Sequence, residues 1–155
     1  MKILIDADGC PVVDLTIQTS RQYAAKHSLA PITVLILCDT SHVFNKEGAE
    51  TITVDKGADS ADFALANRAQ AGDIVVTQDY GLAALCLARG GIPLNQDGMA
   101  YTQQNIDALL FSRYASKKDR AAGIRSGARL KKRTRAQNNT FAQALQQLLA
   151  QQLPT

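Results

Sequence analysis

The stretch Ile3-Leu4-Ile5-Asp6-Ala7-Asp8-Gly9-Cys10-Pro11 decides the fold, because a short apolar run passes directly into two carboxylates and a turn. The apolar run predicts a buried strand, and the proline favours the first turn of a following helix. Residues 73–79 repeat the design, with Asp-Ile-Val-Val-Thr-Gln-Asp. Aspartate suits neither strand nor helix interiors, but it suits loops, caps and the binding of hard cations.

Strand-like and helix-like segments alternate over the first two thirds of the chain. The sequence predicts strands at residues 2–6, 32–38, 51–54, 73–77 and 92–94, and helices at 12–27, 61–70, 82–89 and 102–114. Apolar strands that alternate with helices indicate an α/β fold with three layers, in which a mostly parallel β-sheet is flanked by helices. Ligand sites in such folds lie at the carboxyl ends of the strands.

The C-terminal third differs from the rest in charge. Residues 1–112 carry seven Lys/Arg and thirteen acids, whereas residues 113–155 carry ten Lys/Arg and one acid. We expect an α/β domain over 1–114, a basic segment without regular structure over 115–137, and a helix over 138–155 that packs on the domain or on a second copy in a homodimer. The charge division favours a polyanionic partner such as RNA, although a solvated, flexible basic segment explains it equally well.

The composition indicates an ordinary globular domain in the cytoplasm. The chain is 46% hydrophobic and 20% charged, and no apolar stretch approaches the roughly 20 residues that span a bilayer. We therefore expect no membrane partner, and the N-terminus shows no signal-peptide pattern. Cys10, Cys38 and Cys86 are too widely spaced to indicate a disulfide framework or a zinc site. Cys10 lies near a predicted helix start, where a lowered thiol pKa would make it reactive, but we expect a structural role.

Acidic residues cluster where three of the predicted strands end. Asp6 and Asp8 follow the first strand, Asp59 and Asp62 lie after the third, and Asp79 follows the fourth. Carboxylates that meet within a few ångströms hold cations, which activate water and stabilise phosphoryl transfer. The alternative is a purely structural role, in which each of these aspartates only caps a helix or a turn.

Three blocks carry a family resemblance: DADGCPV at residues 6–12, VDKGADSAD at 54–62 and GDIVVTQDYGLA at 72–83. In this order and spacing they resemble the YaiI/YqxD (DUF188) family of uncharacterised bacterial proteins, which is regarded as PIN-like. Asn105, Ile106, Leu109 and Arg113 fit the same pattern. The resemblance covers nearly the whole chain.

The resemblance implies a PIN-like fold and a ribonuclease that depends on Mg²⁺ or Mn²⁺. PIN-like domains typically have an aspartate after the first strand, an acid at the start of a middle helix, and a Thr-x-Asp at the end of a later strand. Asp6 matches the first position, Asp62 or Asp59 the second, and Asp79, after Thr77, the third.

These matches assign roles to the residues of the expected site. Asp6 and Asp79 would be catalytic, and the metal ligands would be Asp6, Asp8, Asp62 and Asp79, with Asp8 as an additional carboxylate. Asp59 and Thr77 would support them, with the Thr77 hydroxyl orienting Asp79. Phosphates would be contacted by the basic side chains of Arg113, Lys117, Lys118, Arg120, Arg125, Arg129, Lys131, Lys132 and Arg133.

Two other functions fit parts of the sequence. Asp6-x-Asp8-Gly9 after a strand resembles the first motif of the haloacid-dehalogenase phosphatases, in which Asp6 would be a nucleophile and Asp8 a general acid/base. Against this, Asp73 opens a strand where that superfamily places an acid after one. A nucleic-acid-binding module without catalysis would need only the basic segment.

Overall fold

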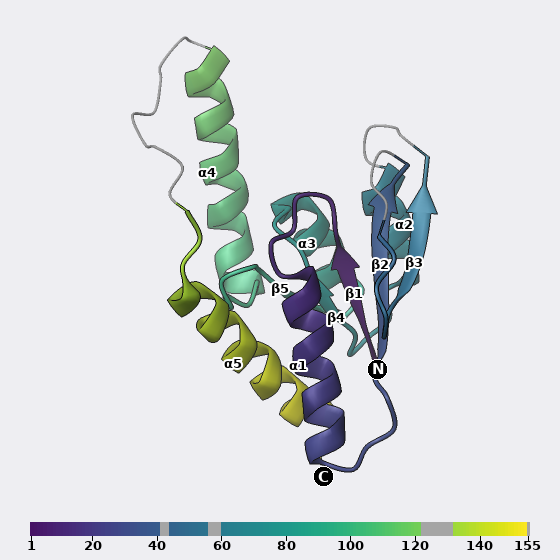
Figure 1. Ribbon diagram of the computed structural model, residues 1–155. Coiled ribbons are helices and arrows are strands. Elements are labelled where there is room, and N and C mark those ends of the chain that lie inside the picture. The colour runs from purple at the N-terminus through teal and green to yellow at the C-terminus, as the bar shows by residue number, and fades with distance from the viewer. Residues whose placement is uncertain (41–43, 56–59, 122–131, 155) are drawn as a thin grey trace.

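The sheet is entirely parallel among the residues that the computed structural model describes, namely 1–40, 44–55, 60–121 and 132–154. Its strands are β1 (Lys2–Asp6), β2 (Thr33–Asp39), β3 (Glu50–Val54), β4 (Ile74–Val76) and β5 (Ile92–Leu94). The strand order is β3-β2-β1-β4-β5 (Figure 1). The predicted α/β class is confirmed.

Helices cover both faces of this sheet. They are α1 (Val13–Lys26), α2 (Ser60–Arg68), α3 (Tyr80–Ala88), α4 (Gln103–Ala121) and α5 (Arg135–Gln152). Helices α1 and α5 pack on one face and α2 and α3 on the other, which gives the three predicted layers (Figure 1). Helix α4 packs on α3 and extends past the carboxyl edge of the sheet (Figure 1). No helix in the described part of the chain has the length and apolar character to cross a membrane.

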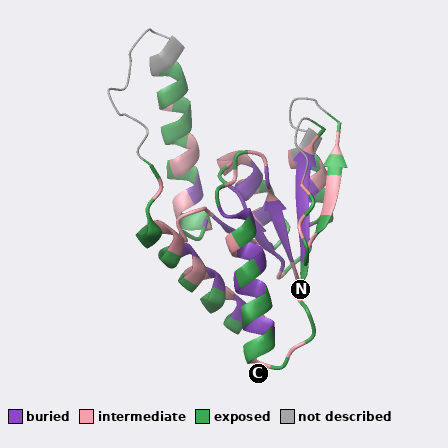
Figure 2. Ribbon diagram, in the orientation of Figure 1, coloured by how far each residue is buried: buried purple, intermediate pink, exposed green. Residues whose placement is uncertain are grey.

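Side chains of β1 alternate between two hydrophobic cores. Ile3 and Ile5 pack with residues of α1 and α5, whereas Leu4 packs with residues of α2 and α3. The interior of the sheet is buried (Figure 2), and a strand covered on both faces needs apolar residues throughout. Charged residues are therefore confined to the strand ends, and Asp6 is the last residue of β1.

The C-terminal helix begins three residues earlier than predicted. Thr134 caps α5, with its side chain and that of Gln137 forming a reciprocal capping box. The Thr-x-x-Gln pattern at 134–137 satisfies two backbone groups at once, and the polar residues at 138–140 lie within the helix. Phe141, Leu145 and Leu149 are fully buried against α1 and the sheet of the same chain.

The basic segment expected to lack regular structure begins as a helix. Helix α4 was expected to end at residue 114, but it continues to Ala121. Lysine, arginine and alanine are good helix formers, so propensity carries the helix beyond its last buried apolar position. Residues 122–131 lie outside the described residues.

Candidate functional site

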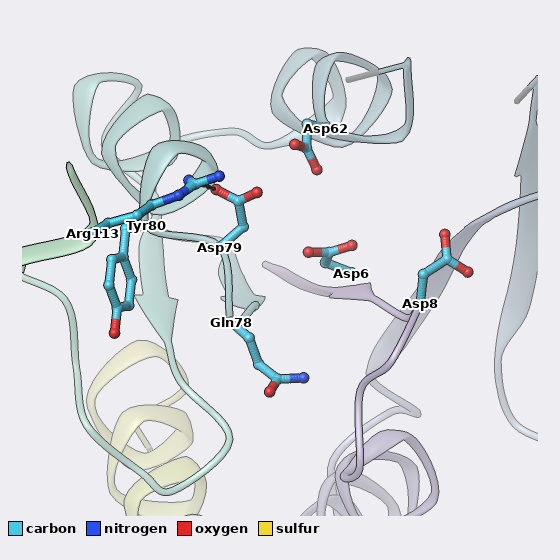
Figure 3. Close-up of a pocket in the computed structure, with 7 residues that line it drawn as sticks. All are labelled: Asp6, Asp8, Asp62, Gln78, Asp79, Tyr80 and Arg113. Atoms are coloured by element: carbon cyan, nitrogen blue, oxygen red, sulfur yellow. Dashed lines mark hydrogen bonds and ion pairs between the residues drawn. The ribbon is translucent and has the colours of Figure 1, made fainter. Parts of the chain in front are cut away.

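Four aspartates line one cleft at the carboxyl edge of the sheet. Asp6 ends β1, Asp8 lies in the turn after it, Asp62 lies in the first turn of α2, and Asp79 immediately precedes α3. The cleft has a volume of about 460 Å³ and is also lined by Gln78, Tyr80 and Arg113 (Figure 3). Asp6 and Asp79 meet because β1 and β4 are hydrogen-bonded neighbours. The structure thus brings together the four aspartates expected to hold a metal.

Thr77 links Asp6 and Asp79 through hydrogen bonds. Its buried hydroxyl donates a hydrogen bond to Oδ2 of Asp6 at 2.8 Å and accepts one from the backbone N–H of Asp79 at 3.0 Å. The Tyr101 hydroxyl in turn donates to the Thr77 carbonyl at 3.1 Å. The family resemblance implied that this hydroxyl would orient Asp79. The hydroxyl binds the Asp79 backbone and, in addition, orients the Asp6 carboxylate.

Asp79 caps α3 and also lines the cleft. Its Oδ1 accepts a hydrogen bond from the Leu82 N–H at 3.1 Å and so caps α3, and the same oxygen lies 3.4 Å from Nη1 of Arg113. A Cβ atom at position 81 would lie 3.2 Å from this oxygen, so Gly81 allows the close approach. None of the hydrogen bonds found in the described residues uses Oδ2. The cap therefore occupies one oxygen of the carboxylate.

Ionisation of the Asp6 carboxyl group costs free energy in the folded protein. The pKa of its carboxyl group is raised to about 6, mainly by burial and also by the nearby carboxylates of Asp79 and Asp8, while the hydrogen bond from Thr77 opposes the increase. Ionisation of Asp6 is therefore unfavourable in the protein alone. A cation bound beside it would relieve this cost and stabilise the fold.

Asp8 differs from the other aspartates in orientation. Its Oδ2 accepts a hydrogen bond from the Asp39 N–H at 3.0 Å, and its carboxylate points away from Asp6 and Asp79 (Figure 3). Asp8 therefore ties the turn after β1 to the end of β2.

The site fits a hard cation by the chemistry of its donors. Carboxylate oxygens are the ligands that Mg²⁺ and Mn²⁺ prefer, and Asp6, Asp62 and Asp79 face a common space (Figure 3). As the side chains stand, no three His, Cys, Asp or Glu within the described ranges are close enough together to hold one ion. The fit is thus one of donor type and shared cleft.

Comparison with known proteins places the chain in a family. It matches the family model described as "Uncharacterized BCR, YaiI/YqxD family" over residues 4–151. The chain belongs to the YaiI/YqxD family. The resemblance carried by the three sequence blocks is thereby confirmed.

Three relatives in the family align over 90% or more of their own length. A UPF0178 protein of Exiguobacterium sibiricum is 52% identical over 97% of this chain and 98% of its own. UPF0178 proteins of Ruminiclostridium cellulolyticum and Natranaerobius thermophilus are 46% and 40% identical, over 94% and 97% of this chain and 90% and 97% of their own. No solved structure matches the chain significantly.

The basic residues of this YaiI/YqxD chain are placed unequally with respect to the cleft. Arg113 lines it, whereas Lys117 and Lys118 are exposed farther along α4, and Lys132 is exposed before α5. The predicted site residues outside the described residues are Asp59, Arg125, Arg129, Lys131 and the side chain of Arg120.

Arg133 is engaged within the protein. Its Nη1 lies 2.8 Å from Oδ1 of Asp97, its Nε donates to the Asn138 side chain at 2.6 Å, and its Nη2 donates to the Gln96 carbonyl. The guanidinium thus fastens the start of α5 to the turn after β5. These contacts leave it few donors for a phosphate.

Arg133→Ala is expected to lower the free energy of unfolding by about 1–2 kcal/mol, because its partially exposed hydrogen bonds to charged and polar groups are lost. Lys132→Ala removes an exposed neighbouring cation and should change stability by less than about 0.5 kcal/mol. Urea unfolding of the two variants provides the comparison. Equal stability of the two would show that Arg133 does not fasten α5.

Two residues of the cleft escaped sequence analysis, namely Gln78 and Tyr80. The Gln78 amide donates a hydrogen bond to the Gly9 carbonyl at 2.9 Å, which joins the turns after β1 and β4. The Tyr80 ring meets Tyr101 edge-on, with the ring centroids 6.0 Å apart. Their position on either side of Asp79 was the available signal.

Of the two roles considered for Cys10, the structural one fits the structure. The pKa of the Cys10 thiol is raised to about 11, mainly by burial and to a smaller extent by the carboxylate of Asp6. Helix α1 begins only at Val13, and the Cys10 side chain packs against the core beneath α1. Desolvation therefore outweighs any effect of the helix start, and the structural role is the one that fits.

Thr77→Val should lower Mn²⁺ affinity by roughly 10- to 100-fold, the usual cost of losing a group that orients a metal ligand. Valine keeps the shape but leaves Asp6 without a donor and the Asp79 N–H without an acceptor. Thr77→Ser keeps the hydroxyl and should remain within a few-fold of wild type. Titration calorimetry with Mn²⁺ measures the effect, and equal binding by the valine and serine variants would remove Thr77 from the site.

Proposed function

We propose that this chain is a Mg²⁺- or Mn²⁺-dependent nuclease, or a related phosphodiesterase, that acts on RNA. The observation that carries the proposal is the single cleft in which Asp6, Asp62 and Asp79 face one another and Arg113 approaches within 3.4 Å of Asp79 (Figure 3). Acidic ligands beside an arginine suit a phosphodiester, because a cation and a guanidinium both bind phosphate oxygens.

Each side chain has a distinct task in this proposal. Asp6 and Asp79 are the catalytic ligands, with Asp62 and, after rotation, Asp8 completing the oxygen donors. When bound, the cation supplies an activated water and neutralises charge on the phosphate. Arg113 binds a non-bridging phosphate oxygen, and Thr77 holds Asp6 in place.

A basic path leads away from the cleft along α4. Lys117 lies one helical turn beyond Arg113 and therefore on the same side of the helix. Lys118 adds a further exposed cation, and α4 extends beyond the sheet edge (Figure 1). Such a row tracks a nucleic-acid backbone by sequence-independent phosphate contacts.

The phosphatase alternative receives less support from the geometry. It needs Asp8 as a general acid/base beside a nucleophilic Asp6, but the Asp8 carboxylate points toward the backbone of Asp39.

An RNA cleavage assay tests the proposal. Purified wild-type protein is incubated with end-labelled RNA in Mn²⁺, in Mg²⁺ or in EDTA. Asp107→Asn is the matched control for site variants such as Asp6→Asn, because it also removes one carboxylate but Asp107 is exposed on α4 and outside the cleft. We expect both proteins to cleave RNA with a divalent cation and neither to do so in EDTA.

Other results would assign the site differently. Hydrolysis of a small phosphomonoester, with a beryllofluoride adduct on Asp6, would favour the phosphatase. Binding of RNA without cleavage in either metal would overturn the nuclease and leave a nucleic-acid-binding module.

A further inference from the structure

A smaller hollow adjoins the acidic cleft between α2, α3 and α4. Its lining consists of Asp62, Phe63, Asp79, Gly81, Leu82, Leu85 and Arg113. Asp62, Asp79 and Arg113 also line the acidic cleft. The carboxylates and the guanidinium therefore stand on the border between the two hollows.

The outer part of the smaller hollow is apolar and exposed. Phe63 on α2 is 59% exposed and Leu85 on the neighbouring α3 is 43% exposed. Single exposed apolar residues are common on protein surfaces. These two are informative because they come from different helices and line the same hollow beside the acidic cleft.

The size and charge of the hollow select its occupant. Its volume is about 220 Å³, which is below the roughly 300–1,000 Å³ of a typical small-molecule pocket. It therefore suits one ring system rather than a whole ligand. Its inner border carries Arg113 beside Asp62 and Asp79, where the proposed function places a phosphate and its cation, so that ring would belong to a molecule with an anionic group next to it. A nucleobase attached to a phosphodiester backbone has this combination.

We infer that Phe63 and Leu85 form a base-binding subsite, which holds an unpaired nucleobase next to the phosphate in the acidic cleft. The inference rests on the proposed function and narrows its substrate to nucleic acid that is single-stranded at this point. Bases within a duplex are stacked on each other, so their faces cannot reach Phe63. Stacking on an aromatic ring tolerates any base, since each base has a π-face.

Binding measurements on full-length protein test the subsite, in an Asp6→Asn background that is expected to slow cleavage strongly. The probes are a fluorescein-labelled single-stranded oligoadenylate and a blunt RNA duplex of the same length. The variants are Phe63→Ala, Phe63→Trp and Phe111→Ala. Phe111 is the matched control, because it is 71% exposed on α4 and lines neither hollow.

Phe63→Ala should weaken binding of the single strand roughly tenfold or more, which is the usual effect of removing one stacked aromatic ring. Phe63→Trp should bind as tightly as the parent, and Phe111→Ala should not differ from it. Duplex binding should be unchanged in all three. Undiminished single-strand binding by Phe63→Ala, or equal loss for single strand and duplex, would overturn the subsite.

The subsite and the nuclease fail in different ways. Should the protein with Asp6 intact cleave RNA while Phe63→Ala binds normally, the subsite is wrong and the nuclease stands. Phe63-dependent binding without cleavage would support the subsite and overturn the nuclease. A protein that neither binds nor cleaves RNA would overturn both.

Discussion

Replacing Asp6 with asparagine (Asp6→Asn) is expected to lower Mn²⁺-dependent RNA cleavage by more than about 100-fold and to leave RNA binding in place. Groups that merely orient a metal ligand cost roughly 10- to 100-fold when removed, and Asp6 is a direct ligand in the proposed site. Asparagine keeps the shape of the side chain and still accepts the hydrogen bond from Thr77. Single-turnover rates and fluorescence anisotropy measure the two effects separately.

The same substitution should stabilise the metal-free protein at neutral pH, by about 1–3 kcal/mol. Burial first, and then the charges of Asp79 and Asp8, raise the pKa of Asp6 from 3.8 to about 6 in the folded protein. Because the folded pKa lies above the unfolded one, ionisation of Asp6 opposes folding. The penalty is absent below about pH 4, grows as the pH rises to about 6 and is constant above that.

Urea unfolding at several pH values separates this effect from general damage. Asp6→Asn should unfold at higher urea than wild type at pH 7, and the difference should vanish near pH 4. Saturating Mn²⁺ should reverse the order, because the cation binds the folded wild-type site more tightly than the variant. A metal-free Asp6→Asn protein that is less stable than wild type at pH 7 would show that this carboxylate is structural.

The fold was predictable because the strands of a parallel sheet that is covered on both faces are almost entirely apolar, which is easily recognised in the sequence. The strands at residues 3–5 and 74–76 are wholly apolar and buried, so aspartate occurs only where each strand ends. Any parallel order would place Asp6 and Asp79 at the same edge. Their adjacency depends on β1 pairing with β4, a long-range choice that no local pattern specifies.

Residues whose roles depend on distant partners could not be assigned from sequence. Arg133 lies in a basic run, which locally predicts a solvated segment, yet Asp97 is 36 positions away and pairs with it. The extension of α4 to Ala121 was missed for a different reason. Its last turns have no apolar periodicity, so a pattern-based boundary falls at the last buried residue even though helix propensity continues.

Unlike Asp6→Asn, the substitution Asp73→Asn should destabilise the protein. It should lower the free energy of unfolding by about 3 kcal/mol at pH 7, which corresponds to a decrease of roughly 6–12 °C in Tm. Asp73 is buried and accepts hydrogen bonds from the Lys2 ammonium at 2.6 Å, the Lys2 N–H at 3.0 Å and the Gln70 N–H at 2.9 Å. Asparagine removes the charge of the pair and turns an amide donor toward other donors. Differential scanning calorimetry measures the change, with exposed Asp107→Asn as the control.

The pH dependence distinguishes this aspartate from Asp6. Burial alone would raise the pKa of Asp73, but the hydrogen bonds from Lys2 and Gln70 hold it below its ordinary value. Its contribution to stability is therefore fully present above about pH 4 and is lost as the pH falls through the folded pKa. The stability difference between wild type and Asp73→Asn should persist down to about pH 4 and shrink only below it. The stability difference between wild type and Asp6→Asn should instead shrink between about pH 6 and pH 4. If Asp73→Asn were as stable as wild type at pH 7, the ion pair with Lys2 would not hold β4 to β1. The pH dependence of stability would then fail to distinguish Asp73 from Asp6.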